Sequence, residues 1–288
     1  MTPPLPPSPA PMPAPVRVDG VDVLRAVEYR VVPGYRPLLL DLHRPDTVPS
    51  PPLVVFVHGG GWRMGSRGTF GPSFADWSPS PFAHLAARGL AVASLDYRLS
   101  GEAVFPAALD DVVDGLCWLR EHAGELGVDA SRVVLWGESA GAHLAALAGL
   151  LDGDVRGVVD WYGPADLGTM AADAAAGGIA ITDPGAPDSR ESLLLGAPVG
   201  DDPDRARAAS PVAHVRAGAP PFLVLHGTAD RFVPARQSER LVAALESVGA
   251  PVRCELVDGA DHLWLGAPDV ARSAFETSAA FASECLTP

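Results

Sequence analysis

The chain has 288 residues, of which 48% are hydrophobic and 19% charged, so it can bury a substantial core. All 21 basic residues are arginine, and lysine and asparagine are absent. These absences exclude Schiff-base enzymes, P-loop nucleotide binding and Cys-His-Asn proteases. A net charge of −14 makes a nucleic-acid partner or an anionic membrane surface unfavourable.

The cysteines and the first residues indicate a cytoplasmic protein. Three widely spaced cysteines, Cys117, Cys254 and Cys285, form no CxxC pair, which argues against a disulfide framework or a zinc site. Residues 1–15 hold eight prolines and no basic residue, which predicts a disordered tail rather than a secretory signal. The apolar stretch 144–151 is too short to span a bilayer, so no membrane partner is expected.

From residue 16 to 288 the pattern predicts a single α/β domain. An antiparallel hairpin is expected first, over 27–32 and 38–42, and near-continuous apolar runs and amphipathic segments then alternate. Strands are predicted at 53–57, 90–95, 132–136, 155–161, 222–225 and 252–257, and helices at 80–88, 106–122, 140–151, 235–248 and from 267. Apolar strands that alternate with helices favour a mostly parallel sheet with helices on both faces.

Residues 165–209 interrupt the alternation with a stretch rich in Ala, Gly, Asp and Pro. So long a gap in a compact domain is usually functional, and it lies where ligands bind in such sheets. We expect a small cap or binding loop; the alternative is a surface excursion without function.

The motif Gly137-Glu138-Ser139-Ala140-Gly141 joins a predicted strand to a predicted helix. A nucleophile elbow needs glycines two residues either side of its serine, because the turn is strained and its neighbours pack closely. GxSxG alone is weak, but this context fits, and the backbone N–H of Ala140 would then contribute to an oxyanion hole.

The run His58-Gly59-Gly60-Gly61-Trp62 follows the strand 53–57. Consecutive glycines let a backbone turn its N–H groups towards a substrate. A phosphate cradle is the alternative, but the run lacks GxGxxG spacing.

A serine nucleophile needs a base, and the base needs an orienting carboxylate. Asp230 and His262 each follow a predicted strand, which places both at the edge of the sheet where Ser139 is expected. Asp258 and Asp261 are competing acids, but Asp261 adjoins the histidine too closely in sequence to brace its ring, so Asp230 is favoured.

Five motifs now carry a family resemblance: HGGGW, DYRLS at 96–100, WGESAG, HGTAD and GADH. Over about residues 24–285 the chain resembles α/β-hydrolase esterases, and most closely the bacterial feruloyl-esterase-like (BD-FAE) branch, which is related to hormone-sensitive-lipase-like carboxylesterases. The resemblance implies an α/β-hydrolase fold, with Ser139 as nucleophile, His262 as base and then acid, and Asp230 as its orienter. It also implies an oxyanion hole from Gly60, Gly61 and Ala140.

Several other polar and aromatic residues are expected to line a pocket, to pack or to form ion pairs. Trp62, Trp161, Tyr162 and Trp264 follow motifs or strand ends and could line a substrate pocket, although core packing explains each as well. His58 is expected to hold its glycine loop, His143 to pack, and Glu138 to position the elbow. Asp96 and Arg98 suggest an ion pair, and three aspartates of one helix suggest a solvated face: Asp110, Asp111 and Asp114.

The expected function is a serine carboxylesterase that hydrolyses neutral, short-acyl or aryl esters through an acyl-enzyme, with no cofactor and no metal. Its partner is a small-molecule ester, and a homo-oligomer is left open. The same triad could serve a formamidase, peptidase, lactonase or acyltransferase. A non-catalytic binding protein on a hydrolase scaffold is the rival from another class.

Overall fold

The computed structural model describes residues 11–287, in which nine strands form one sheet in the order β1-β2-β3-β5-β4-β6-β7-β8-β9. Pairing is antiparallel from β1 to β5 along this order and parallel from β5 to β9. The strands are β1 Val16–Val18, β2 Val21–Arg30, β3 Leu38–Arg44, β4 Pro52–Val57, β5 Ala91–Leu95, β6 Asp129–Glu138, β7 Val155–Trp161, β8 Phe222–Gly227 and β9 Val252–Val257. The expected mostly parallel sheet is confirmed. Residues 1–10 of the expected tail lie outside the described residues, and 11–15 form no helix or strand.

The predicted hairpin is confirmed, but its first strand begins six residues earlier, at Val21. The register of β2 against β3 shifts between Leu24 and Val27, where Ala26 has a positive φ of 56° and its N–H donates to the Asp41 carboxylate. Such a bulge breaks the two-residue alternation by which a strand is recognised in a sequence.

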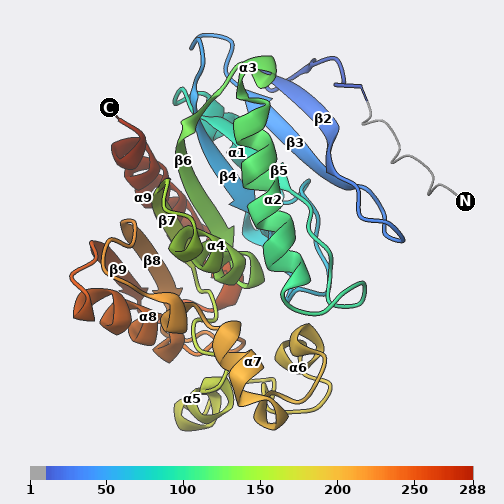
Figure 1. The fold of residues 1–288 in the computed structure, drawn as a ribbon. Helices are drawn as coiled ribbons and strands as arrows, with labels where there is room; N and C mark the ends of the chain where they lie inside the picture. Colours follow the sequence, from blue (N-terminus) through green and yellow to red (C-terminus); the bar gives the residue numbers. More distant parts are fainter. Residues whose placement is uncertain (1–10, 288) are drawn as a thin grey trace, which may run out of the picture.

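Helices cover both faces of the sheet (Figure 1). Along β4, Leu53, Val55 and Val57 belong to the core on the side of α2 and α4, whereas Val54 and Phe56 pack on the side of α1 and α9. All five side chains are fully buried, which is why the strand reads as one continuous apolar run. The helices are α1 Pro81–Ala86, α2 Ala107–Glu121, α3 Ala123–Leu126, α4 Ala140–Leu151, α8 Arg236–Ser247 and α9 Pro268–Leu286.

The stretch 165–209 holds three short helices that the sequence did not predict: α5 Met170–Gly177, α6 Arg190–Leu195 and α7 Pro203–Ala208. They gather beyond the ends of the sheet towards which the parallel strands point (Figure 1). Each of the last two begins at a side-chain cap, because Ser189 and Asp202 accept the backbone N–H three residues later.

The acidic helix and the expected Asp96–Arg98 pair require correction. Asp111 on α2 is fully buried, and its carboxylate accepts two hydrogen bonds of 2.8 Å from the guanidinium of Arg98 and is also paired with Arg30. Asp96 instead pairs with Arg67 at 2.6 Å. Only Asp110 and Asp114 lie on the more exposed side of the helix, since α2 packs its Asp111 side against the sheet.

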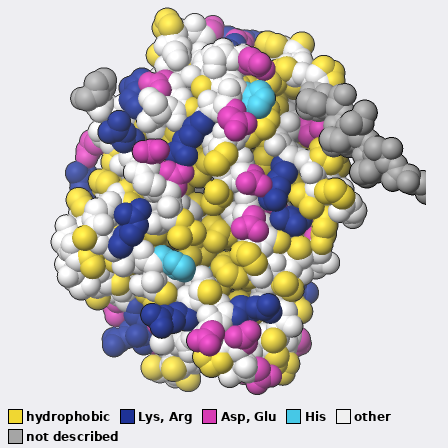
Figure 2. Space-filling view, viewed as in Figure 1, with side chains coloured by type: hydrophobic (Ala, Val, Ile, Leu, Met, Phe, Trp, Pro, Cys, Tyr) yellow, Lys and Arg dark blue, Asp and Glu magenta, His cyan; other side chains and the backbone are white. Residues whose placement is uncertain are grey.

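Hydrophobic side chains gather in the middle of the face shown in Figure 2, with arginine and acidic side chains interspersed around them. In the part of the chain from 11 to 287, none of the helices is long and apolar enough to cross a membrane.

Candidate active site

Ser139 lies in a strained turn between β6 and α4, with φ 53° and ψ −120°. An L-residue in this region costs of order 1–3 kcal/mol, so the surroundings must hold it. The flanking glycines allow that packing: a Cβ on Gly141 would collide with the carbonyl oxygen of Val57, and one on Gly137 would collide with Gly141 itself. The Ser139 N–H donates to the Trp161 carbonyl at 2.8 Å, which ties the turn to β7.

The side chains of Ser139, His262 and Asp230 form one continuous hydrogen-bonded chain. His262 Nε2 lies 3.0 Å from Ser139 Oγ, and His262 Nδ1 lies 2.6 Å from Asp230 Oδ2. All three are at least nine-tenths buried. This is the order in which a base can take the serine proton while a carboxylate orients its ring.

Hydrogen bonds from the backbone position Asp230, and those from two histidines keep it ionised. Its Oδ1 accepts the N–H groups of Phe232 and Val233, both at 2.8 Å. Burial would raise the pKa of Asp230, but the hydrogen bonds from His226 and His262 outweigh it and hold the pKa well below its ordinary value. The carboxylate therefore stays charged while it orients His262.

The competing acids have other partners. Asp261 caps the turn that begins with His262, accepting the His262 N–H at 2.7 Å, and it is paired with Arg231. Asp258 accepts the Thr228 hydroxyl at 3.2 Å. The structure thus brings Asp230, and neither rival, to the ring of His262.

The glycine loop after β4 has the conformation that only glycine adopts easily, with φ 115° at Gly60 and 60° at Gly61. A Cβ on Gly60 would collide with the Met64 carbonyl. His58 Nδ1 lies 2.7 Å from the carbonyl oxygen of Gly59, and the His58 ring stacks on Tyr97. His58 therefore helps to hold the glycine loop in place.

Glu138 is buried directly before the nucleophile. The N–H of Gly59 donates to its Oε1 at 3.4 Å, and the Tyr162 hydroxyl donates to its Oε2 at 3.3 Å. Burial raises the pKa of Glu138 to about 7, although these hydrogen bonds lower it in part. Glu138 thus joins the elbow to the glycine loop through a carboxyl group that titrates near neutrality.

The four aromatic residues expected to line a pocket lie in the core, with at most 1% of each exposed: Trp62, Trp161, Tyr162 and Trp264. The Trp62 indole donates to His143 Nδ1 at 3.2 Å, which places His143 as a packed residue. Tyr162 is the nearest of the four to the triad, with its ring centroid 4.7 Å from that of His262. Their burial favours the core-packing alternative over direct contact with a substrate.

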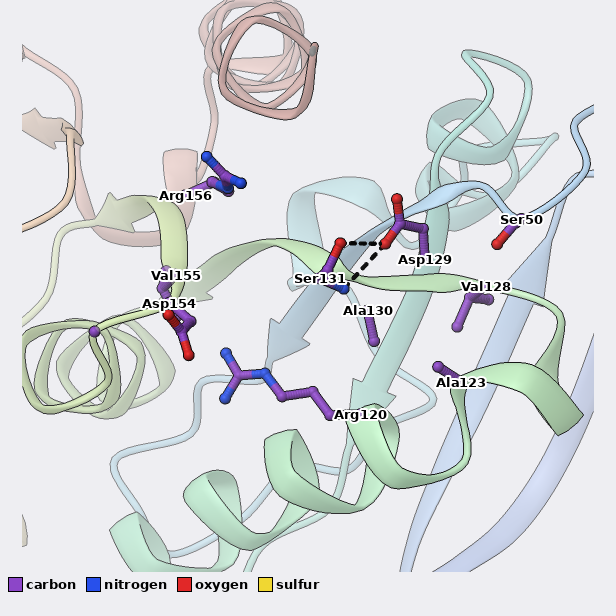
Figure 3. A pocket seen from close by; sticks show the side chains of 11 residues that line it. Ser50, Arg120, Ala123, Val128, Asp129, Ala130, Ser131, Asp154, Val155 and Arg156 are labelled. Atoms are coloured by element: carbon purple, nitrogen blue, oxygen red, sulfur yellow. Dashed lines mark hydrogen bonds between the residues drawn. The ribbon is translucent and has the colours of Figure 1, made fainter.

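A cavity of about 600 Å³ opens beside the elbow. Glu138, Gly60 and Leu263 form its wall next to the triad, and four aromatic rings from the loop before α1 and from α1 itself also line it: Phe70, Phe74, Trp77 and Phe82. A cavity of about 870 Å³ lies at the opposite edge of the sheet, where Figure 3 shows Arg120, Asp129 and Arg156 around it. It is remote from the triad, so we assign the chemistry to the smaller cavity.

Three residues near the triad escaped the sequence analysis. His226 Nε2 lies 3.2 Å from Asp230 Oδ2, and its position four residues before Asp230 in HGTAD was a usable signal. Arg190 and Phe232 carried no signal: the Arg190 guanidinium lies over the Phe232 ring, 5.0 Å from its centroid, and Phe232 flanks His262. They meet only because the 165–209 stretch folds back onto the sheet edge.

Known proteins resemble this chain in sequence and in fold. The chain is 34% identical over 229 residues to esterase LipQ of Mycobacterium tuberculosis, an alignment that covers 76% of this chain and 52% of LipQ. It is 32% identical over 273 residues to esterase LipC of the same organism, covering 86% of this chain and 66% of LipC. The chain therefore spans between half and two thirds of the length of these curated relatives.

Among solved structures, a truncated carbohydrate esterase from gut microbiota superposes with a TM-score of 0.80 at 24% identity, covering 96% of this chain and 100% of the other. The carboxylesterase EstE1, cloned from a metagenomic library, superposes with a TM-score of 0.75 at 28% identity, covering 92% and 89%. The expected α/β-hydrolase fold is confirmed. The BD-FAE family model matches residues 40–245, and the chain therefore belongs to the BD-FAE family of α/β hydrolases.

Proposed function

We propose that the chain is a serine carboxylesterase in which Ser139, His262 and Asp230 form the catalytic triad. The observation that carries the proposal is the hydrogen-bonded chain from Ser139 Oγ through both nitrogens of His262 to a carboxylate that stays ionised. The named esterases among its relatives support the same reaction class.

The reaction follows from that chain of contacts. As Ser139 Oγ attacks the ester carbonyl carbon, its proton passes to His262 Nε2, and the Nδ1–H of the resulting imidazolium is held by Asp230. The developing oxyanion accepts hydrogen bonds from the backbone N–H groups of Gly60, Gly61 and Ala140. Each of these hydrogen bonds stabilises the transition state by about 3 kcal/mol. His262 then protonates the leaving alcohol, and a water activated by His262 hydrolyses the acyl-enzyme.

The cavity beside Glu138 is suited to bind a small apolar group of the substrate. Its wall of Phe70, Phe74 and Trp77 suits a short acyl chain or an aryl ring, and a volume of about 600 Å³ accommodates either. The stretch 165–209 is proposed to cap the site, because α6 brings Arg190 against Gly61 of the glycine loop. The expected cytoplasmic location and homo-oligomer remain predictions.

The experiment is hydrolysis of 4-nitrophenyl acetate and butyrate, together with labelling by a fluorophosphonate. Ser139→Ala should lower kcat by at least about 10⁴-fold and abolish labelling, whereas the exposed control Ser131→Ala should change neither. Full labelling of the Ser139→Ala protein, or near-wild-type turnover, would refute the assignment. An unlabelled wild-type protein would instead favour a binding protein on this scaffold.

A further inference from the structure

Arg190 is the arginine that α6 brings to the candidate site. Its Nε lies 3.0 Å from the position that a Cβ on Gly61 would occupy, so its aliphatic chain crosses directly over the glycine loop. Its guanidinium carbon lies 5.0 Å from the centroid of Phe232, whose ring centroid is 5.4 Å from that of His262. The side chain therefore bridges the two sides of the triad.

Among residues 11–287, no carboxylate lies within ion-pair distance, 4.0 Å, of Arg190. Fifteen other arginines in this part of the chain do form such pairs, including Arg67 and Arg98. The neighbouring Glu191 is buried, and burial raises the pKa of its carboxyl even though Arg190 lowers it in part. Arg190 thus keeps a positive charge that no neighbouring carboxylate neutralises through direct contact.

Within residues 11–287, the guanidinium of Arg190 lies over the Phe232 ring and donates no hydrogen bond to another residue. A ring attracts the flat face of the group, while the five N–H donors lie in its plane and point away from the ring. Arg190 is half-buried, so its guanidinium is partly open to solvent beside the glycine loop and Phe232. A planar guanidinium can donate two parallel hydrogen bonds to the two oxygens of one carboxylate.

We propose that Arg190 is a specificity-determining residue that binds a carboxylate of the substrate, so that the preferred esters carry one negative charge on the group facing α6. The proposal rests on the esterase function proposed above. It departs from the expectation of neutral esters, which was based on the charge of the whole chain. Exposed charges farther than about 8 Å away are largely screened at physiological salt. The charge preference for a substrate is therefore set by the adjacent guanidinium rather than by the net charge of the chain.

The experiment compares 4-acetoxybenzoate with the neutral 4-acetoxybenzamide. In the wild type, kcat/KM for the benzoate should exceed that for the benzamide, and Arg190→Gln should lower the ratio of the benzoate value to the benzamide value at least about 10-fold. Arg190→Lys should restore part of the preference. Raising NaCl to 0.5 M should weaken it, because exposed charge interactions are screened.

Arg156→Gln is the matched control, because it removes the same charge from an exposed residue at the opposite edge of the sheet. The proposal is overturned if Arg190→Gln slows both substrates equally, which indicates a packing role, or if Arg156→Gln has the same effect. Inhibition of the wild type needs no variant: benzoate should inhibit 4-nitrophenyl acetate hydrolysis at least 10-fold more tightly than benzamide, and equal inhibition counts against Arg190.

The two proposals fail separately. If Ser139→Ala abolishes both hydrolyses while the benzoate preference is indifferent to Arg190, the esterase stands and the carboxylate site does not. If Ser139→Ala keeps its activity, the triad itself is wrong.

Discussion

The buried carboxyl of Glu138 makes the stability of the protein depend on pH. Its pKa is about 7 in the folded chain, against an ordinary value of 4.5. Between these two values the native state holds a proton that the unfolded state has released. Stability must therefore fall as the pH rises through this window, and it falls no further above the folded pKa.

The size of the effect follows from the two values. The full difference corresponds to roughly 3 kcal/mol, most of which is lost between pH 5 and pH 8. Glu138→Gln keeps the shape of the side chain and removes its titration. The free energy of unfolding of the variant minus that of the wild type should therefore rise by roughly 2–3 kcal/mol from pH 5 to pH 8.

Urea unfolding at the two pH values, followed by the fluorescence of the six tryptophans, measures this change. All other titrations occur in both proteins and cancel in the comparison. Glu255→Gln on β9 is the exposed control, and its difference from wild type should stay constant within a few tenths of a kcal/mol. A difference between wild type and Glu138→Gln that is equally independent of pH would refute the reasoning.

Three further substitutions test the site and its support. Asp230→Asn should lower kcat by about 10⁴-fold because the ring of His262 loses its orienter, whereas Asp261→Asn should lower it far less; equal losses in ester hydrolysis would reopen the choice of acid. Asp111→Asn should destabilise the fold by about 3–5 kcal/mol, since it leaves Arg98 buried without its partner, while Asp114→Asn on the outer side of α2 should cost about 0–1 kcal/mol; similar unfolding midpoints would contradict this. Gly141→Ala should yield little folded protein, and a folded, active variant would show that the elbow can move away from β4.

The central strands of the sheet were predictable because they are buried on both faces. Runs such as Leu53–Val57 have no polar interruption, and the predicted strands reappear with shifts at their ends. The nucleophile elbow was predictable for a related reason, since its glycines are required by backbone collisions that any sequence with this turn must avoid. Residues held by local backbone geometry leave a local signature.

Contacts between residues far apart in the sequence leave no such local signature in it. Asp111 sits among acidic neighbours at helical spacing, which reads as a solvated face, and only the fold brings Arg98 and Arg30 to it. Trp161, Tyr162 and Trp264 follow motifs or strand ends, yet their packing in the core on the α9 side of the sheet could not be told from a pocket lining by sequence alone. Arg190 lies in a stretch without periodicity, and its approach to Gly61 depends on how α6 folds back.

Gly141 packs on the carbonyl of Val57, so the nucleophile turn and the start of the glycine loop are held together by a direct contact between their main chains. No side chain lies in this contact that could be exchanged for a larger or smaller one. Substitutions elsewhere therefore cannot adjust the spacing between the nucleophile and the loop by small steps. The segment that carries α6 meets the glycine loop through the side chain of Arg190 instead, so it can change without this main-chain constraint. A scaffold built this way can acquire new substrates by exchanging loops while its reaction stays the same.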